Sequence, residues 1–144
     1  MKMMHARTAS TILPFVKSTL SLQGASQVTV VGHSLGAALA LLDVLSLSLQ
    51  LPGVTVNVVY YSMPRVGNQA FANFVDSQLD GRVAHVINQE VPVPVLPPIF
   101  LGFHHPFGEV HIRDSGAWDV CPGAPSFFLR LGVALSIGFC LTSG

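Results

Sequence analysis

Ser34 is the residue best placed to do chemistry in this sequence, because it stands between two glycines in the pattern Gly-x-Ser-x-Gly. A β-rich and mostly apolar segment precedes Gly32, and a run dominated by Ala and Leu follows Ser34. This order predicts a strand, a tight turn and a helix, with the serine hydroxyl projecting free of the backbone. We expect Gly32 and Gly36 to let the two backbones approach closely, and the amide of Leu35 to be the oxyanion-hole donor. The pattern indicates a serine nucleophile for acyl transfer.

Two blocks of sequence make this pattern specific. Residues 28–40, Val-Thr-Val-Val-Gly-His-Ser-Leu-Gly-Ala-Ala-Leu-Ala, resemble the elbow region of the class 3 lipases, the fungal triacylglycerol lipase and feruloyl esterase family. Residues 61–71, Tyr-Ser-Met-Pro-Arg-Val-Gly-Asn-Gln-Ala-Phe, are similar to that family's Pro-Arg-Val-Gly-Asn segment. The resemblance spans roughly residues 5–123 and implies an α/β-hydrolase fold that carries a serine esterase site.

A third block predicts the histidine that takes the serine proton. Residues 100–112 resemble the family segment that carries the catalytic histidine, and His111 is the match. His111 also follows the chain order of nucleophile, acid and histidine. It would act as general base for Ser34 and then as acid for the leaving alcohol. His104 and His105 are the nearer competitors, and the other three histidines are expected to be ordinary.

The acidic member of the triad departs from the family pattern. The family places an aspartate just before a Val-Pro pair in a proline-rich loop, and ungapped alignment puts Val91 at that position. Valine cannot orient an imidazole. Glu90 is adjacent and serves if the loop is shifted by one residue, since some hydrolases of this fold use glutamate. Asp114 and Asp119 are more remote alternatives.

Alternating helices and strands are predicted along the first two thirds of the chain. An amphipathic helix is expected over residues 7–22, with a kink or a late start at Pro14. Strands are expected at residues 27–31, 54–61 and 82–87, and helices at residues 34–49 and 69–79. This order predicts the C-terminal half of a mostly parallel sheet with flanking helices. Beyond Asn88 the prolines predict a long loop.

The family resemblance also divides the chain. It implies a partial α/β-hydrolase domain over residues 1–123, followed at residues 124–144 by an apolar C-terminal tail that is unlike the family. The family places strands, a lid and an oxyanion-hole residue ahead of the elbow, whereas this sequence starts one helix before it. The strand at residues 27–31, which reads as buried on both faces, would then become an exposed hydrophobic edge.

Composition limits the partners and the compartment. Half of the 144 residues are hydrophobic, only 10% are charged, and the net charge is +0 without a basic cluster, so a nucleic-acid partner is excluded. Uncharged ester or lipid substrates fit better, with contact to a lipid–water interface, while the oligomeric state stays undetermined. No metal or organic cofactor is implied, and we expect Cys140 to remain free. No signal peptide is visible, although the family is extracellular.

These observations predict a lipase-like serine carboxylic ester hydrolase that acts on neutral lipid or ester substrates through an acyl-enzyme at Ser34. The alternative is a catalytically inactive or truncated remnant that keeps the fold but lacks the triad aspartate. A membrane-associated interaction protein that uses the apolar tail is the third hypothesis.

Overall fold

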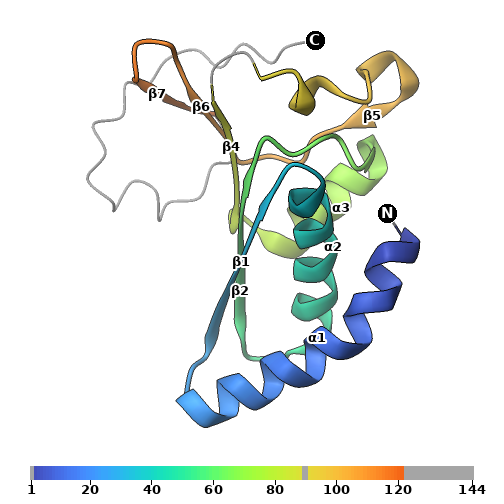
Figure 1. Ribbon diagram of the computed structural model, residues 1–144, viewed down its shortest axis with the longest axis vertical. Helices are drawn as coiled ribbons and strands as arrows, with labels where there is room; N and C mark the ends of the chain where they lie inside the picture. The colour runs from blue at the N-terminus through green and yellow to red at the C-terminus, as the bar shows by residue number, and fades with distance from the viewer. Residues whose placement is uncertain (1, 89–90, 122–144) are drawn as a thin grey trace.

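A mostly parallel β-sheet organises the chain in a computed structural model, which describes residues 2–88 and 91–121 (Figure 1). Its strands lie in the order β1-β2-β4-β6-β7. The parallel strands are β1 (Gln27–His33), β2 (Thr55–Tyr61), β4 (Val83–Asn88) and β6 (Glu109–Ile112), and β7 (Trp118–Val120) pairs antiparallel with β6. The expected α/β fold, with parallel strands joined through helices, is confirmed.

Three helices lie on one side of this sheet in Figure 1. They are α1 (Lys2–Gln23), α2 (Leu35–Gln50) and α3 (Gln69–Leu79). α2 is rich in Ala and Leu and contributes more buried residues to the main core than any other element, packing against inward side chains of β2 such as Val56, Val58 and Tyr60. Burial of this apolar surface is the main stabilising contribution to such a layer. A smaller cluster on the other face centres on Ala84, Val86 and Val110.

β1 differs from the expectation of a strand buried on both faces. Its side chains alternate between exposed and half-buried, and Val31 is 62% exposed. The reason is position, because β1 is the edge of the sheet and the described helices cover only one of its faces. The exposed hydrophobic edge predicted from the family comparison is therefore present.

Pro14 does not delay the first helix. α1 begins at Lys2 and is helical through Pro14, so the alternative of a late start is wrong. Proline leaves the carbonyl four residues earlier without its usual donor. That carbonyl belongs to Ser10, and Ser10 and Pro14 both lie on the exposed side of the helix, where water can satisfy it. Figure 1 shows α1 bending along its length, as expected for a helix that contains proline.

The segment after β4 contains more structure than the proline pattern predicts. Two short 3₁₀ turns, η1 (Val93–Val95) and η2 (Ile99–Leu101), lie within the predicted loop. β5 (Phe103–His104) follows and pairs antiparallel with β3 (Gly67–Asn68), which lies between β2 and α3, and then come β6 and β7. These strands are two to four residues long, which is too short for a hydrophobic period to reveal them.

The C-terminal tail at residues 124–144 and the expectation for Cys140 lie outside the described residues. Cys121, just after β7, is disulfide-bonded. Among the described helices, none is long and apolar enough to cross a membrane.

Candidate active site

Ser34 occupies the turn between β1 and α2 in a strained backbone conformation. Its φ is 53° and its ψ is −124°, a region that residues other than glycine seldom enter. The main-chain N–H of Ser34 donates to the carbonyl of Tyr61 at 3.0 Å, and its own carbonyl accepts from the amides of Ala37 and Ala38. The turn is thus held from both sides, as a nucleophile elbow requires.

The two glycines that flank this turn differ in how much space surrounds them. A Cβ added at Gly32 would lie 2.5 Å from the carbonyl oxygen of Gly36 and 2.6 Å from Cα of Ala37. Both contacts are with backbone, so only glycine lets β1 and α2 cross this closely. At Gly36 an added Cβ meets nothing within 4 Å. The expectation that both glycines serve the close approach is therefore correct for Gly32 and wrong for Gly36.

The amide of Leu35 lies at the first helical position of α2. Amides in the first turn of a helix have no acceptor within the helix, and the helix dipole adds positive potential there. An anion that forms at Ser34 would therefore face donors that need no rearrangement, which is the property of an oxyanion hole. The oxyanion-hole role of Leu35 stays a prediction.

His111 lies too far across the sheet to contact Ser34 directly. It is on β6, and β2 and β4 lie between β6 and β1. Three strand spacings of about 4.8 Å place the two backbones roughly 14 Å apart. A general base must come within about 3 Å of the hydroxyl. The structure therefore does not bring His111 and Ser34 together in the described conformation, and the base role of His111 stays a prediction.

All six histidines of the chain lie among the described residues, so the others can be compared with His111 as candidate bases. His105 is a poor base at neutral pH, since burial lowers its pKa to about 4. Its Nε2 atom is 2.8 Å from the carbonyl of Pro94, so the neutral ring donates there. His85 is fully buried on β4, where its Nε2 accepts from the amide of Met63 and its ring contacts those of Tyr60 and His105.

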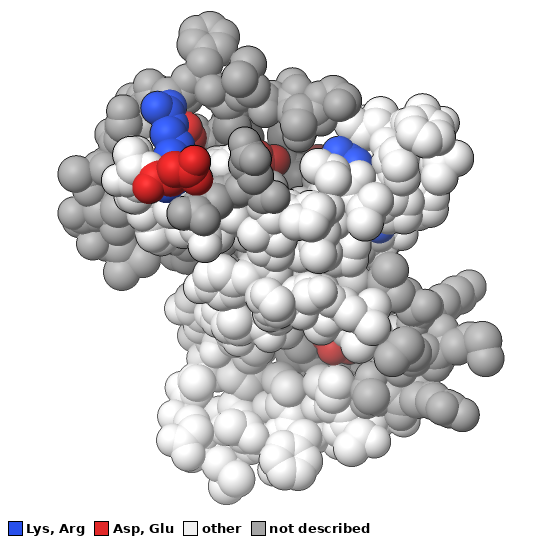
Figure 2. Space-filling model, turned by 45° about the horizontal axis from the view of Figure 1, so that its top comes forward, with Lys and Arg blue, Asp and Glu red and all other residues white. Residues whose placement is uncertain are grey.

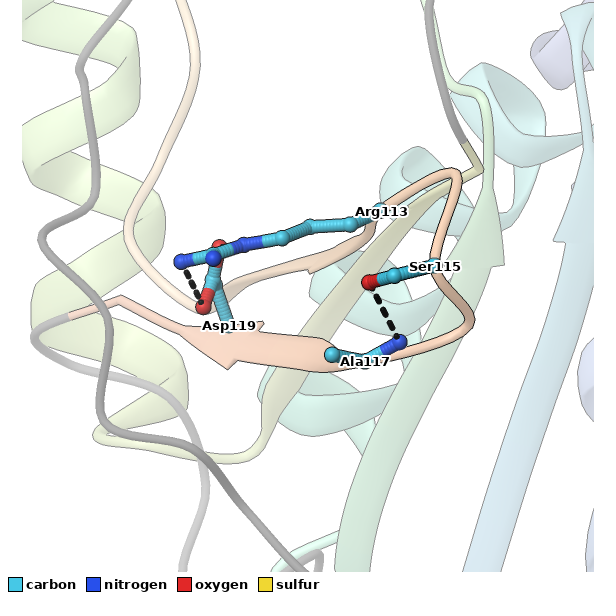
Figure 3. Close-up of polar contacts among 4 residues, drawn as sticks. All are labelled: Arg113, Ser115, Ala117 and Asp119. Carbon is cyan, nitrogen blue, oxygen red and sulfur yellow. Dashed lines mark hydrogen bonds and ion pairs between the residues drawn. The ribbon is translucent and has the colours of Figure 1, made fainter.

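The candidate acids also lie apart from the nucleophile. Asp119, a remote candidate, is buried on β7 directly opposite His111, but both of its carboxylate oxygens accept from Arg113 (Figure 3). A bidentate pair of this kind is strong, so the carboxylate of Asp119 is held by its arginine partner. Glu90 lies outside the described residues. Val91 begins the loop after β4 and carries no polar side-chain atom, so it cannot supply the acid.

Comparison with known protein families identifies the family of this chain. The family model described as lipase (class 3) matches residues 1–101 of the chain. The chain belongs to the class 3 lipase family. The resemblance inferred from the motifs is therefore confirmed, and the nucleophile role of Ser34 stays a prediction.

Curated relatives of this class 3 lipase chain include secreted mono- and diacylglycerol lipases of Malassezia species. The secreted mono- and diacylglycerol lipase MDL2 of Malassezia globosa is 38% identical over 130 residues, which is 89% of this chain and 43% of that protein. The secreted mono- and diacylglycerol lipase LIP4 of Malassezia restricta is 38% identical over 104 residues, which is 71% of this chain and 35% of that protein. The chain thus spans less than half the length of these relatives.

Solved lipase structures share the fold. Lipase II from Rhizopus niveus superposes with a TM-score of 0.75 at 31% identity, over 82% of this chain and 46% of that chain. A triacylglycerol lipase in which a serine protease triad forms the catalytic centre superposes with a TM-score of 0.72 at 34% identity, over 76% of this chain and 42% of that chain. The class 3 lipase fold of the described residues is clear at this level of agreement.

Arg65 is a buried charged residue to which the sequence reasoning assigned no role. It is 5% exposed, and its side chain donates to carbonyls of the proline loop. Burial lowers the pKa of its guanidinium, while the nearby carboxylate of Glu109 raises it. A signal was available, because Arg65 is the only charged residue in the 32 positions between Asp43 and Asp76. Its partners lie 30 or more residues away in sequence, so the pattern alone did not name them.

Proposed function

We propose that this class 3 lipase chain forms the nucleophile half of a serine ester hydrolase that acts on neutral acylglycerols or related esters. Ser34 would attack the ester carbonyl and become acylated, and the amide of Leu35 would stabilise the oxyanion. The observation that carries this proposal is the strained Ser34 backbone, held between β1 and α2 by the close crossing at Gly32. Strain of this kind persists where function requires it.

An apolar surface supports a lipid-like substrate. Several large apolar side chains of the loop after β4 are exposed to solvent, and Phe100 is the most exposed of them at 86%. Figure 2 shows a face on which charged atoms occupy a few separate spots and the rest of the described surface is uncharged. Exposed apolar patches of this kind mark ligand or membrane contacts. We call this surface the apolar rim; it consists of Val95, Leu96, Phe100 and Leu101.

Hydrogen bonds link the apolar rim to the nucleophile. Ser34 is bonded to Tyr61 at the end of β2, and Arg65, four residues further, is bonded to Leu96. The rim therefore lies at the carboxyl ends of the strands, as the elbow does, and open α/β sheets bind their ligands at these ends. An acyl chain lying along the rim would carry its ester towards Ser34, and contact with a lipid–water interface would use the same surface. The relatives are secreted, and we propose an extracellular site of action here as well.

A second candidate is a fold that does not turn over, and the placement of His111 favours it. No described histidine is hydrogen-bonded to the hydroxyl of Ser34. Without a base and an ordered acid, the serine would rely on the oxyanion donors alone. The two candidates differ in whether Ser34 is activated, and that difference is measurable.

Covalent labelling by an alkyl fluorophosphonate tests the proposed function. The probe requires an activated serine, and mass spectrometry of the labelled peptide identifies the site. We expect labelling at Ser34 and none in Ser34→Ala, with Ser62→Ala as a matched control because Ser62 also has a positive φ but follows β2. Labelling that persists in Ser34→Ala would reject the nucleophile assignment. Absence of labelling in a folded parent chain would favour the inactive alternative.

A further inference from the structure

Arg65 and His105 hold the loop after β4 by its main chain. Four consecutive carbonyls, those of residues 94–97, all accept hydrogen bonds from these two residues. Prolines in the loop cannot donate, so the loop has few hydrogen bonds of its own to fix its course. The bonds run from His105 Nε2 to Pro94 O at 2.8 Å, from Arg65 Nη1 to Val95 O at 2.6 Å and Pro97 O at 3.1 Å, and from Arg65 N to Leu96 O at 2.8 Å.

This arrangement decides where the side chains of the loop point. Because the carbonyls turn inward towards Arg65, the side chains of Val95 and Leu96 face solvent, 46% and 52% exposed. Their exposure has no benefit for folding, since burial would stabilise apolar groups of this size. The same loop continues into η2, which carries Phe100 and Leu101. The apolar rim is thus a consequence of the hydrogen bonds beneath it.

The chemistry of arginine suits this role. A guanidinium presents five donors in a rigid plane, so one nitrogen can satisfy two carbonyls without side-chain freedom. The buried charge is balanced by Glu109, whose pKa is raised by burial and lowered by the charges of His111 and Arg65. Lysine in this place would keep the charge but lose the planar fork.

We propose that Arg65, together with His105, is a positioning residue that shapes the apolar rim and thereby sets the preference for long acyl chains. This proposal rests on the proposed function, since it concerns the substrate of the same site. Arg65 does not touch the ester. Its loss would leave the chemistry at Ser34 in place and remove the contacts with the distal acyl chain.

The test compares two fluorophosphonates that differ only in alkyl length, ethyl and dodecyl, by their second-order rates of labelling at Ser34. We expect Arg65→Met to lower the ratio of dodecyl to ethyl rates by about tenfold, the effect of losing a methylene or more of apolar contact. The ethyl rate should stay near that of the parent. Arg65→Lys should restore part of the ratio.

Arg82→Met is the matched control. Arg82 also donates to two main-chain carbonyls, those of Leu79 and Gln78, but it lies at the end of α3 and not at the rim. We expect it to leave the ratio unchanged. An unchanged ratio in Arg65→Met, or an equal fall of both rates, would overturn the positioning role and leave Arg65 as a structural residue.

A second measurement separates this proposal from the proposed function. Binding of an unreactive ether lipid, dodecyl glycerol ether, needs the rim but no activated serine. If neither fluorophosphonate labels the parent chain, the proposed function fails, and a loss of ether-lipid binding in Arg65→Met but not in Arg82→Met still supports the positioning role. Equal binding by the parent and Arg65→Met overturns it.

Discussion

The two glycines of the elbow give the sharpest prediction, because the structure assigns them opposite effects on stability. A methyl group at Gly32 would lie 2.5 Å from Gly36 O, 2.6 Å from Ala37 Cα and 2.8 Å from Ala37 N. These atoms belong to the first turn of α2 and cannot rotate away, so β1 and α2 must separate. Forced overpacking of this kind typically costs about 1–3 kcal/mol.

Gly36 provides the internal control, since it lies in the first turn of α2 with nothing within 4 Å of an added Cβ. Alanine is favoured over glycine in helices by up to about 1 kcal/mol, and less near a helix end. We therefore expect Gly32→Ala to lower the free energy of unfolding by about 2 kcal/mol and Gly36→Ala to leave it equal or raise it slightly. The two variants should differ by roughly 2–3 kcal/mol.

Urea unfolding followed by far-ultraviolet circular dichroism measures both variants, with the disulfide of Cys121 kept intact. A difference of about 2 kcal/mol also corresponds to a shift in Tm of about 4–8 °C for a chain of this size. Labelling of Ser34 by a fluorophosphonate should fall in Gly32→Ala because the elbow geometry changes. Equal stability of the two variants would refute the argument that the backbone crossing depends on Gly32 alone.

Three further predictions follow from the site. Burial lowers the pKa of His105 to about 4 in the folded chain, below the usual value of about 6.5, so the unfolded chain binds the proton first. This contribution to stability is complete above pH 6.5 and is lost as the pH falls towards 4. The loss amounts to about 2–3 kcal/mol at pH 4.5. Urea unfolding at pH 7.5 and at pH 4.5 should therefore give a smaller difference in unfolding free energy for His105→Asn than for the parent chain. His111→Ala should leave the labelling rate of Ser34 unchanged if the described separation holds, whereas a loss of about 10³-fold or more would establish His111 as the base. Val91→Asp, with the N-terminal half supplied from a close relative, should raise ester turnover by orders of magnitude if Val91 fills the position of the acid. If Glu90 has taken over that role, Glu90→Gln is instead the change that lowers turnover. If neither variant differs from the parent, Asp114 and Asp119 become the candidates for the acid.

The strongly periodic elements could be predicted from sequence because each carries its own signals. The bounds of α3 agree with the expected residues 69–79, since Asn68 caps the helix by accepting from the amide of Phe71 and the apolar period continues to Leu79. The Ser34 elbow was likewise predicted, as a local motif whose strand and helix are continuous in sequence.

What could not be predicted depends on distant contacts. β6 is four residues long and is stabilised by pairing with β4 and β7, so its local sequence did not indicate a strand. The exposure of one face of β1 depends on which helices pack against that face, and the described helices cover only the other one. The different demands on Gly32 and Gly36 depend on the crossing distance of two backbones, which spacing in a motif does not report.

The free edge of β1 has a consequence for hydrogen exchange. Along a strand, successive amides point to alternate sides, and β1 pairs with β2 on one side only. Every second amide proton from Gln27 to His33 should therefore be protected while its neighbours exchange rapidly, which is a two-residue alternation along the whole strand. Any strand that came to pair with this edge would slow the rapid set without altering the protected set. The alternation thus acts as an internal gauge of whether the sheet ends at β1 in solution.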